Sequence, residues 1–170
     1  NAKKQNLQDK VNGKVGSMDD LEFQEEELDV IWSEGAIYNI GFEKGIDYWH
    51  KFIKKEGYIA VTEACWFTDE RPKEIEDFWN DVYPEIDTIA NKVSKLQKAN
   101  YLPIATFVLP ENCWTEHFYK LHEPARKEFL KQYKGNKQAE EFIAFEKYET
   151  QLYHKYKAYY GYAFFIGKKV

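Results

Sequence analysis

The sequence lacks the residues that would define a metal-binding or membrane-embedded protein. Its two cysteines, Cys65 and Cys113, are far apart, and its four histidines are scattered, so neither set has the spacing of a metal motif. No apolar run approaches the roughly 20 residues that cross a bilayer. The sequence does not decide whether the two cysteines form a disulfide, although a reduced cytoplasmic protein is the simpler interpretation. We therefore expect no bound metal, no membrane segment and a cytoplasmic location.

A concentrated basic surface is also missing. The net charge is −5, and the lysines are interspersed with acidic residues. Nucleic-acid phosphates attract a dense positive charge, so nucleic acid is not expected as a partner. Methionine is scarce, with Met18 the single one, whereas aromatic residues make up 18% of the chain. Large rings fill cores and also line pockets for planar or apolar ligands. The length of 170 residues suits one domain.

Apolar runs of strand length predict an α/β fold. The almost unbroken run Leu28–Trp32 is typical of a parallel strand buried on both faces. A helical pattern follows, and a helix stop signal at Lys54–Gly57 precedes the next strand. This strand–helix–strand order implies a parallel crossover. The predicted strands are Val11–Gly16, Leu28–Trp32, Tyr58–Glu63, Tyr101–Leu109 with Pro103 at its beginning or on an exposed edge, and Tyr162–Gly167.

Longer helical patterns lie between the later strands. The expected helices cover Pro72–Val82, Ile89–Asn100, Thr115–Tyr133 with a break before Pro124, and Lys137–Tyr160, which Gly161 ends. The last of these carries an aromatic stripe, and such stripes usually belong to the core; its members are Phe142, Phe145, Leu152, Tyr156 and Tyr159. We expect the regions near 68–100 and 115–160 to form helical caps beside the sheet.

The order of these features resembles class I S-adenosylmethionine-dependent methyltransferases. The stretch Gly16–Phe23 followed by Leu28–Ile31 is similar to the loop after that family's third strand and to its fourth strand. Lys54–Val61 resembles the turn into its fifth strand, and the last two predicted strands resemble its sixth and seventh. The resemblance implies a Rossmann-like methyltransferase fold, with a mostly parallel sheet, an antiparallel last strand and helical insertions.

This resemblance also implies where the cofactor, S-adenosylmethionine, binds. Ligands of open α/β sheets lie beyond the carboxyl ends of the strands. The implied adenine contacts are Ser17, Met18 and Asp19, and the implied contacts to the methionine moiety and methyl donor are Ser33, Glu34, Gly35 and Ala36. A tight solvated turn is the alternative for the first group. Tyr38 and Trp66 follow strand ends and are substrate candidates, with core packing weighed equally.

The expected function is methyl transfer to a small-molecule acceptor. Positioning supplies much of the catalysis in such a reaction, and a base is needed only when the acceptor must lose a proton. Glu34, Tyr38 and His117 are candidate bases, although His117 is better explained as a helix-start residue, and the catalytic residue stays unknown. A non-catalytic partner-binding protein is the alternative function, and a nucleotide-dependent dehydrogenase is a weaker one. The sequence does not decide whether the protein forms a homodimer.

The sequence departs from the family by having no glycine-rich loop after a first strand and no acidic residue that ends a second. We therefore expect residues 1–170 to form a single partial methyltransferase domain, from the third strand to the last. In that family the fourth strand pairs with the first. The strand Leu28–Trp32 should then have a bare apolar edge, and Val11–Gly16 should lack a neighbour.

Overall fold

The computed structural model describes residues 1–170 and contains one five-stranded sheet. Four strands follow the order β1-β2-β5-β4, and the short β3 pairs with the end of β2. The strands are β1 (Leu28–Ser33), β2 (Ile53–Trp66), β3 (Asp87–Thr88), β4 (Tyr101–Val108) and β5 (Tyr160–Lys169). β1 and β3 run parallel to β2, whereas β5 is antiparallel to both β2 and β4. The predicted α/β fold with an antiparallel last strand is confirmed.

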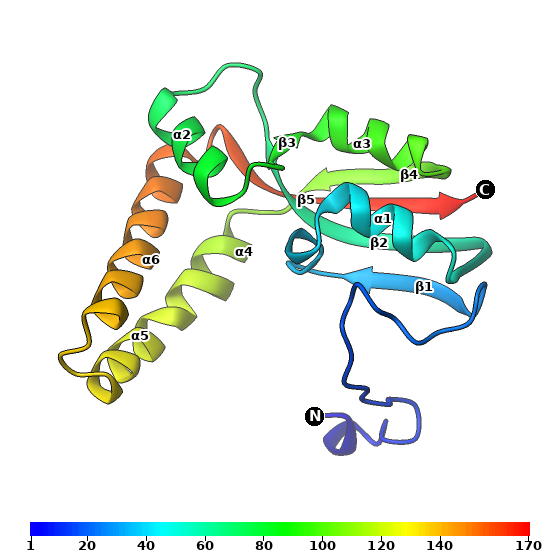
Figure 1. Cartoon of the computed structure of the whole chain (residues 1–170), viewed down its shortest axis with the longest axis horizontal. Helices are drawn as coiled ribbons and strands as arrows, with labels where there is room; N and C mark the ends of the chain where they lie inside the picture. The colour runs from blue at the N-terminus through cyan, green and yellow to red at the C-terminus, as the bar shows by residue number, and fades with distance from the viewer.

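Two helices cover one face of the sheet (Figure 1). They are α1 (Phe42–His50) and α3 (Ile89–Lys98), and their apolar residues pack on β2 and β5 in a shared core cluster. Phe42 of α1, for example, meets Phe165 of β5 edge to face, with 5.5 Å between ring centroids. Between β1 and α1 the chain makes a short 3-10 helix, Ile37–Asn39. A second 3-10 turn, Ala2–Gln5, lies near the amino terminus.

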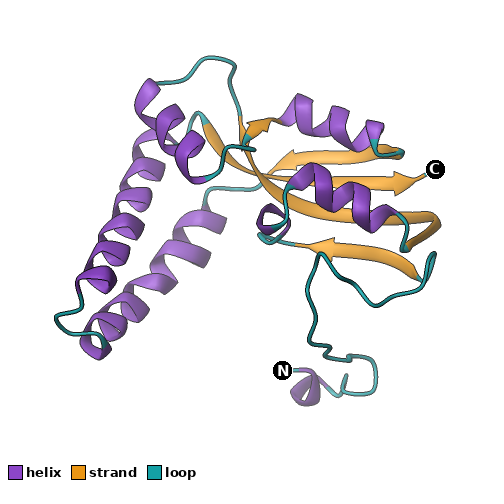
Figure 2. Cartoon of the chain, in the orientation of Figure 1, coloured by secondary structure: helices purple, strands orange, loops and turns teal.

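The other helices gather beyond the carboxyl ends of β1 and β2 and form a helical lobe (Figures 1 and 2). A second core cluster of aromatic residues joins this lobe to the ends of β2 and β5. The lobe consists of α2 (Lys73–Val82), α4 (Asn112–Trp114), the π-helical turn Thr115–Tyr119, α5 (Lys120–Gln132) and α6 (Lys137–Tyr156). The lobe therefore covers the edge of the sheet at which α/β proteins bind ligands.

The amino-terminal expectations need correction. Val11–Gly16 is no strand: the segment is exposed, and the nearest pairing is an isolated bridge between Ser17 and Asp20. β1 is an edge strand with β2 as its one neighbour, which agrees with the expected bare edge, but it is not buried on both faces. The side chains of Val30 and Trp32 are 49% and 64% exposed, because α1 and α3 pack on the opposite face.

Element boundaries also differ from the sequence pattern. β2 begins at Ile53, earlier than the predicted start at Tyr58, and Lys54–Gly57 lies inside it as a bulge. The pairing shows this bulge, because Leu28 pairs with Ile53 and Val30 already pairs with Tyr58. Gly161 lies inside β5, since α6 ends at Tyr156.

The expectations for the helical lobe are only partly met. α5 passes through Pro124 without a break, and the irregularity precedes it at the π-helical turn. The expected core stripe is incomplete, because Phe142 and Phe145 of α6 are 52% and 43% exposed. Pro103 lies as expected near the start of an edge strand, β4.

Candidate functional site

The turn that follows β1 forms one end of the candidate site. Gly35 adopts a left-handed conformation, with φ of 56°, which glycine tolerates without strain. Its backbone N–H donates to Thr62 Oγ1 of β2 at 2.7 Å, and this bond fixes the turn to the neighbouring strand. Glu34 Oε1 accepts from Trp32 Nε1 at 2.8 Å. Ser33 Oγ is buried without a hydrogen-bond partner. The carboxyl edge of β1 thus presents an ordered turn with one unsatisfied hydroxyl.

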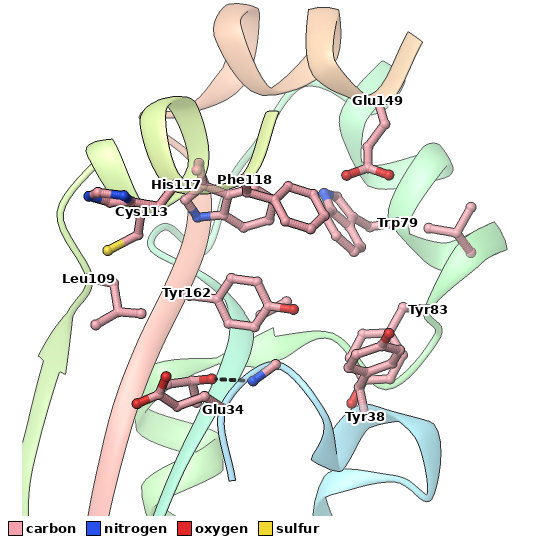
Figure 3. A pocket seen from close by; sticks show the side chains of 15 residues that line it. Glu34, Tyr38, Trp79, Tyr83, Leu109, Cys113, His117, Phe118, Glu149 and Tyr162 are labelled. Atoms are coloured by element: carbon pink, nitrogen blue, oxygen red, sulfur yellow. Dashed lines mark hydrogen bonds between the residues drawn. The ribbon is translucent and has the colours of Figure 1, made fainter. Parts of the chain in front are cut away.

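A cavity of about 490 Å³ opens between this turn and the helical lobe (Figure 3). Such a volume lies within the range of small-molecule sites. Three of the predicted site residues, Glu34, Gly35 and Tyr38, line it together with the candidate base His117. The remaining lining residues are Thr62, Ala64, Trp79, Val82, Tyr83, Leu109, Cys113, Trp114, Phe118, Glu149 and Tyr162.

Aromatic packing builds the walls of the cavity. Trp114 stacks on Tyr153 of α6 with 4.7 Å between ring centroids and lies 5.0 Å from Tyr162 of β5. Tyr38 meets Tyr83 edge to face at 6.2 Å, so the turn after β1 touches the end of α2. The lining rings of Trp114, Tyr162, Tyr38 and Tyr83 thus come from α4, β5, the 3-10 helix after β1 and the end of α2. Three polar atoms of the lining aromatic residues are buried and have no hydrogen-bond partner. They are Trp79 Nε1, Trp114 Nε1 and Tyr83 OH.

Glu149 supplies a carboxylate at the opposite end of the cavity from Glu34 (Figure 3). It projects from α6, and its Oε1 accepts a hydrogen bond from Tyr119 OH at 3.1 Å. Burial raises the pKa of the Glu149 carboxyl, with the charge of Glu146 adding to the effect. No lysine, arginine or histidine forms an ion pair with it. Glu149 is therefore a sheltered carboxylate without a cationic partner.

A second buried acidic group lies behind the cavity, on the face that α1 and α3 cover. Glu63 of β2 is fully buried, and burial raises the pKa of its carboxyl. Lys92 of α3 is equally buried, and its Nζ lies 3.4 Å from Glu63 Oε1 and 2.8 Å from the backbone oxygen of Glu85. Tyr83 connects this pair to the cavity, because it lines the cavity and its ring centroid lies 5.5 Å from Lys92 Nζ.

The structure separates the remaining predicted residues from the cavity. Met18 is half-buried against the core beside α1, and its carbonyl accepts from Trp49 Nε1 at 2.8 Å. The hydroxyl of Ser17 donates to the exposed Asp19 carboxylate, which lowers the Asp19 pKa. Ala36 caps the short helix that follows β1. Trp66 is buried in the second core cluster, with the Arg71 guanidinium 4.4 Å from its ring centroid.

Sequence reasoning missed most of the cavity wall. Trp79 lies in the predicted helix Pro72–Val82 but was not predicted as a site residue. Trp114, Phe118, Glu149 and Tyr162 had no local signal of a site either. The structure holds no group of three or more histidine, cysteine or acidic side chains that could bind a metal. None of its helices is both long and apolar enough to cross a membrane. Cys65 and Cys113 are both free thiols, so this structure contains no disulfide between them.

Comparisons with known proteins place this geometry in a fold class. No family model and no curated protein sequence matches the chain. An S-adenosylmethionine-dependent methyltransferase from Geobacter sulfurreducens, crystallised with S-adenosylhomocysteine, matches with a TM-score of 0.78 and 14% identity over 99% of this chain. The cyclase SpnF matches with a TM-score of 0.74 and 16% identity over 99% of this chain. A putative sarcosine dimethylglycine methyltransferase from Galdieria sulphuraria matches with a TM-score of 0.68 and 14% identity over 99% of this chain.

These likenesses establish the Rossmann-like methyltransferase fold, which the sequence predicted. At sequence identities this low, the matches support a shared fold but not a shared reaction. The chain spans 68% of the Geobacter sulfurreducens protein, 63% of the Galdieria sulphuraria protein and 59% of SpnF.

Proposed function

We propose that this chain takes part in methyl transfer from S-adenosylmethionine to a small-molecule acceptor. The observation that carries the proposal is the aromatic cavity, which begins at the turn after β1 and is closed by the helical lobe. In open α/β folds this edge of the sheet binds ligands. Several of the solved structures with this fold contain S-adenosylmethionine or S-adenosylhomocysteine.

The residues at the carboxyl end of β1 fit the cofactor. Ser33 Oγ is a buried hydroxyl that needs a partner, and the ligand's amino-acid group could provide one. The space beside Gly35 is open, since a side chain added there would meet no atom within 4 Å. Glu34 offers a carboxylate at the same turn. We propose that Ser33, Glu34, Gly35 and Ala36 hold the methionine end of the cofactor.

We propose the loop of Ser17, Met18 and Asp19 as the adenine end. The Asp19 carboxylate, ordered by Ser17, can accept a hydrogen bond from an exocyclic amine. The thioether of Met18 suits an aromatic face, because sulfur is soft and polarisable. Its backbone bond to Trp49 keeps the loop close to α1.

The acceptor then occupies the aromatic cavity, with Tyr38 among its contacts. When bound, S-adenosylmethionine supplies an activated methyl group, and the chain contributes the positioning of the acceptor and the exclusion of water. Tyr38 and His117 line the cavity and are candidate bases for an acceptor that must lose a proton. Glu34 is the third candidate, at the cofactor end.

Calorimetric titration of S-adenosylhomocysteine into the 170-residue chain tests the proposal. Gly35→Val should weaken binding by at least about tenfold, because it fills the open space at the turn. Gly135→Val is the matched control, because Gly135 also has a positive φ, of 78°, and no atom near its added side chain, but lies between α5 and α6 and does not line the cavity. Absence of binding would favour the non-catalytic partner-binding alternative.

A further inference from the structure

The charge of the cavity is one-sided. Its lining includes two carboxylates, Glu34 and Glu149, and no lysine or arginine. His117 is the single lining residue that can carry a positive charge. A ligand carboxylate or phosphate would therefore meet acidic groups and no fixed cation, whereas a ligand cation would find complementary charge.

Glu149 in particular lacks the partner that a sheltered carboxylate needs. The nearest arginine, Arg126 of α5, is already engaged, with its Nε 3.0 Å from Glu146 Oε2 and a further bond to the Glu146 backbone oxygen. Tyr119 supplies one neutral hydrogen bond to Glu149. Glu149 is half-buried, and burial raises the pKa of its carboxyl, although the bond from Tyr119 and the charges of Arg126 and His122 act in the opposite direction. A cation bound in the cavity would supply the missing charge.

The walls are suited to the same kind of ligand. The indole N–H groups of Trp79 and Trp114 and the hydroxyl of Tyr83 are shielded from the cavity, so these residues present ring carbon to a ligand. Figure 3 shows Glu149 pointing from α6 towards the rings of Trp79 and Phe118. An ammonium group near aromatic faces gains cation–π attraction, and planar apolar groups stack on the same rings.

We propose that the acceptor of this cavity carries an ammonium group and a planar apolar body, with Glu149 as the counter-ion of the ammonium group. The protonated nitrogen has no lone pair, so it serves to bind the acceptor, and the methyl group goes to another atom of the same molecule. The inference rests on the proposed methyl-transfer function in one respect, which is that the ligand of this cavity is the methyl acceptor. The binding preference itself depends on the cavity alone. The cofactor end of the site, at Glu34, lies at the opposite side of the cavity, so Glu149 is free to serve the second ligand.

A pair of charge-reversed probes tests the preference. Phenethylamine and 3-phenylpropionate have similar size and the same ring but opposite charge at neutral pH. Each is titrated into the unmodified chain, Glu149→Gln and Glu140→Gln, with binding followed by calorimetry. Glu140 is the matched control because it lies on the same helix, is exposed and forms no ion pair. Thermal melting of each variant checks that it folds.

We expect phenethylamine to bind at least about tenfold more tightly than 3-phenylpropionate, and Glu149→Gln to remove about tenfold of that affinity. Glu140→Gln should change nothing. Equal or tighter binding of the carboxylate, binding of neither probe, or an amine affinity unchanged in Glu149→Gln would overturn the proposal. If Glu149→Gln does not fold, the comparison of the two probes on the unmodified chain still decides.

This experiment separates the inference from the proposed function. A protein that prefers the amine but fails to bind S-adenosylhomocysteine keeps the cationic site and loses the methyl-transfer role. A protein that binds S-adenosylhomocysteine and prefers 3-phenylpropionate keeps the methyl-transfer role and loses the amine class. The two titrations use different ligands, so neither result depends on the other.

Discussion

Lys92 and Glu63 form an ion pair in which neither side chain reaches solvent, with 3.4 Å between Lys92 Nζ and Glu63 Oε1. The ammonium group also donates to the backbone oxygen of Glu85 and lies 4.7 Å from the centroid of the Phe42 ring. These contacts join β2, α1 and α3 directly behind the candidate site. The pair therefore ties the covering helices to the strand that carries the cavity floor.

Replacing Lys92 with methionine should destabilise the fold strongly. The substitution keeps an apolar chain of similar length but leaves the Glu63 carboxyl buried without its partner. Removing one member of a buried pair typically costs about 3–5 kcal/mol. Adding Glu63→Gln should recover part of this loss, because the second substitution removes the unpaired charge. Urea unfolding of the single and double variants measures both effects.

Lys95→Met is the control for this prediction. Lys95 lies one helical turn from Lys92 and pairs with Asp87 at 3.4 Å and Glu43 at 3.7 Å, but its side chain is partly exposed. Such pairs contribute less than about 1 kcal/mol. Equal destabilisation by Lys92→Met and Lys95→Met would show that burial of the Lys92–Glu63 pair does not govern its energy.

Gly57 is expected to tolerate no side chain. An added Cβ would lie 2.8 Å from the backbone oxygen of Asp29 and 2.9 Å from that of Lys54, and backbone atoms cannot rotate away. Gly57→Ala should therefore lower the free energy of unfolding by about 1–3 kcal/mol, as overpacking does elsewhere. Gly16→Ala is the comparison, since its added Cβ meets no atom within 4 Å. A melting temperature unchanged in Gly57→Ala would refute the close approach of β1 and β2 at this bulge.

The four long strands of the sheet could be predicted from the sequence because they contain continuous apolar runs, whereas the two-residue β3 has none and was not predicted. β1 and β5 are examples: the residues of each run are adjacent in the chain, so local hydrophobicity suffices to find them. The start of β2 was missed since Lys54–Gly57 has the composition of a helix stop. In the structure these residues form a bulge, and Glu56 takes a positive φ of 67°. Composition alone does not distinguish these two outcomes.

The candidate site was predictable only where it follows a strand. Glu34, Gly35 and Tyr38 were found because they come directly after β1, at the edge where such folds bind ligands. Glu149 was not found because it is one of several acids on a long helix. Its sheltered position depends on Tyr119, which is 30 positions away in sequence. Contacts of this kind come from tertiary packing and leave no local pattern.

Glu74 links α2 to α6 and should make stability depend on pH. Its carboxylate accepts from Lys155 Nζ at 2.6 Å and from the hydroxyl of Tyr156, and these bonds hold the Glu74 pKa below its ordinary value of 4.5. A carboxyl with a lowered folded pKa stabilises the fold above its unfolded pKa, and this contribution is lost as the pH falls. Glu74→Gln should therefore lower the melting temperature at neutral pH.

The difference between Glu74→Gln and the unmodified chain should shrink as the pH falls below 4.5. Thermal melting followed by circular dichroism over this range measures it. Glu141→Gln is a suitable control, because Glu141 of α6 forms a local pair with Lys137 within one helix. A Glu74→Gln difference that stays constant into the acid range would mean that the Glu74 charge contributes nothing to the α2–α6 contact.

The two cysteines should report on the cavity through their reactivity. Cys113 lines the cavity, whereas Cys65 is fully buried in β2, and burial raises the pKa of its thiol. Because the thiolate is the reactive form, Cys113 should react with iodoacetamide in the folded chain and Cys65 only after unfolding. Mass spectrometry of the alkylated peptides distinguishes the two sites.

A ligand in the cavity should then slow alkylation of Cys113. Phenethylamine, bound near Glu149, would occupy the space that the reagent must enter, so protection should rise with its concentration and disappear in Glu149→Gln. Cys113→Ser provides the baseline, since the folded variant should take up no label. Rapid labelling of Cys65 in the folded chain would contradict the buried position of β2, and loss of protection without loss of phenethylamine affinity would locate the ligand away from Cys113.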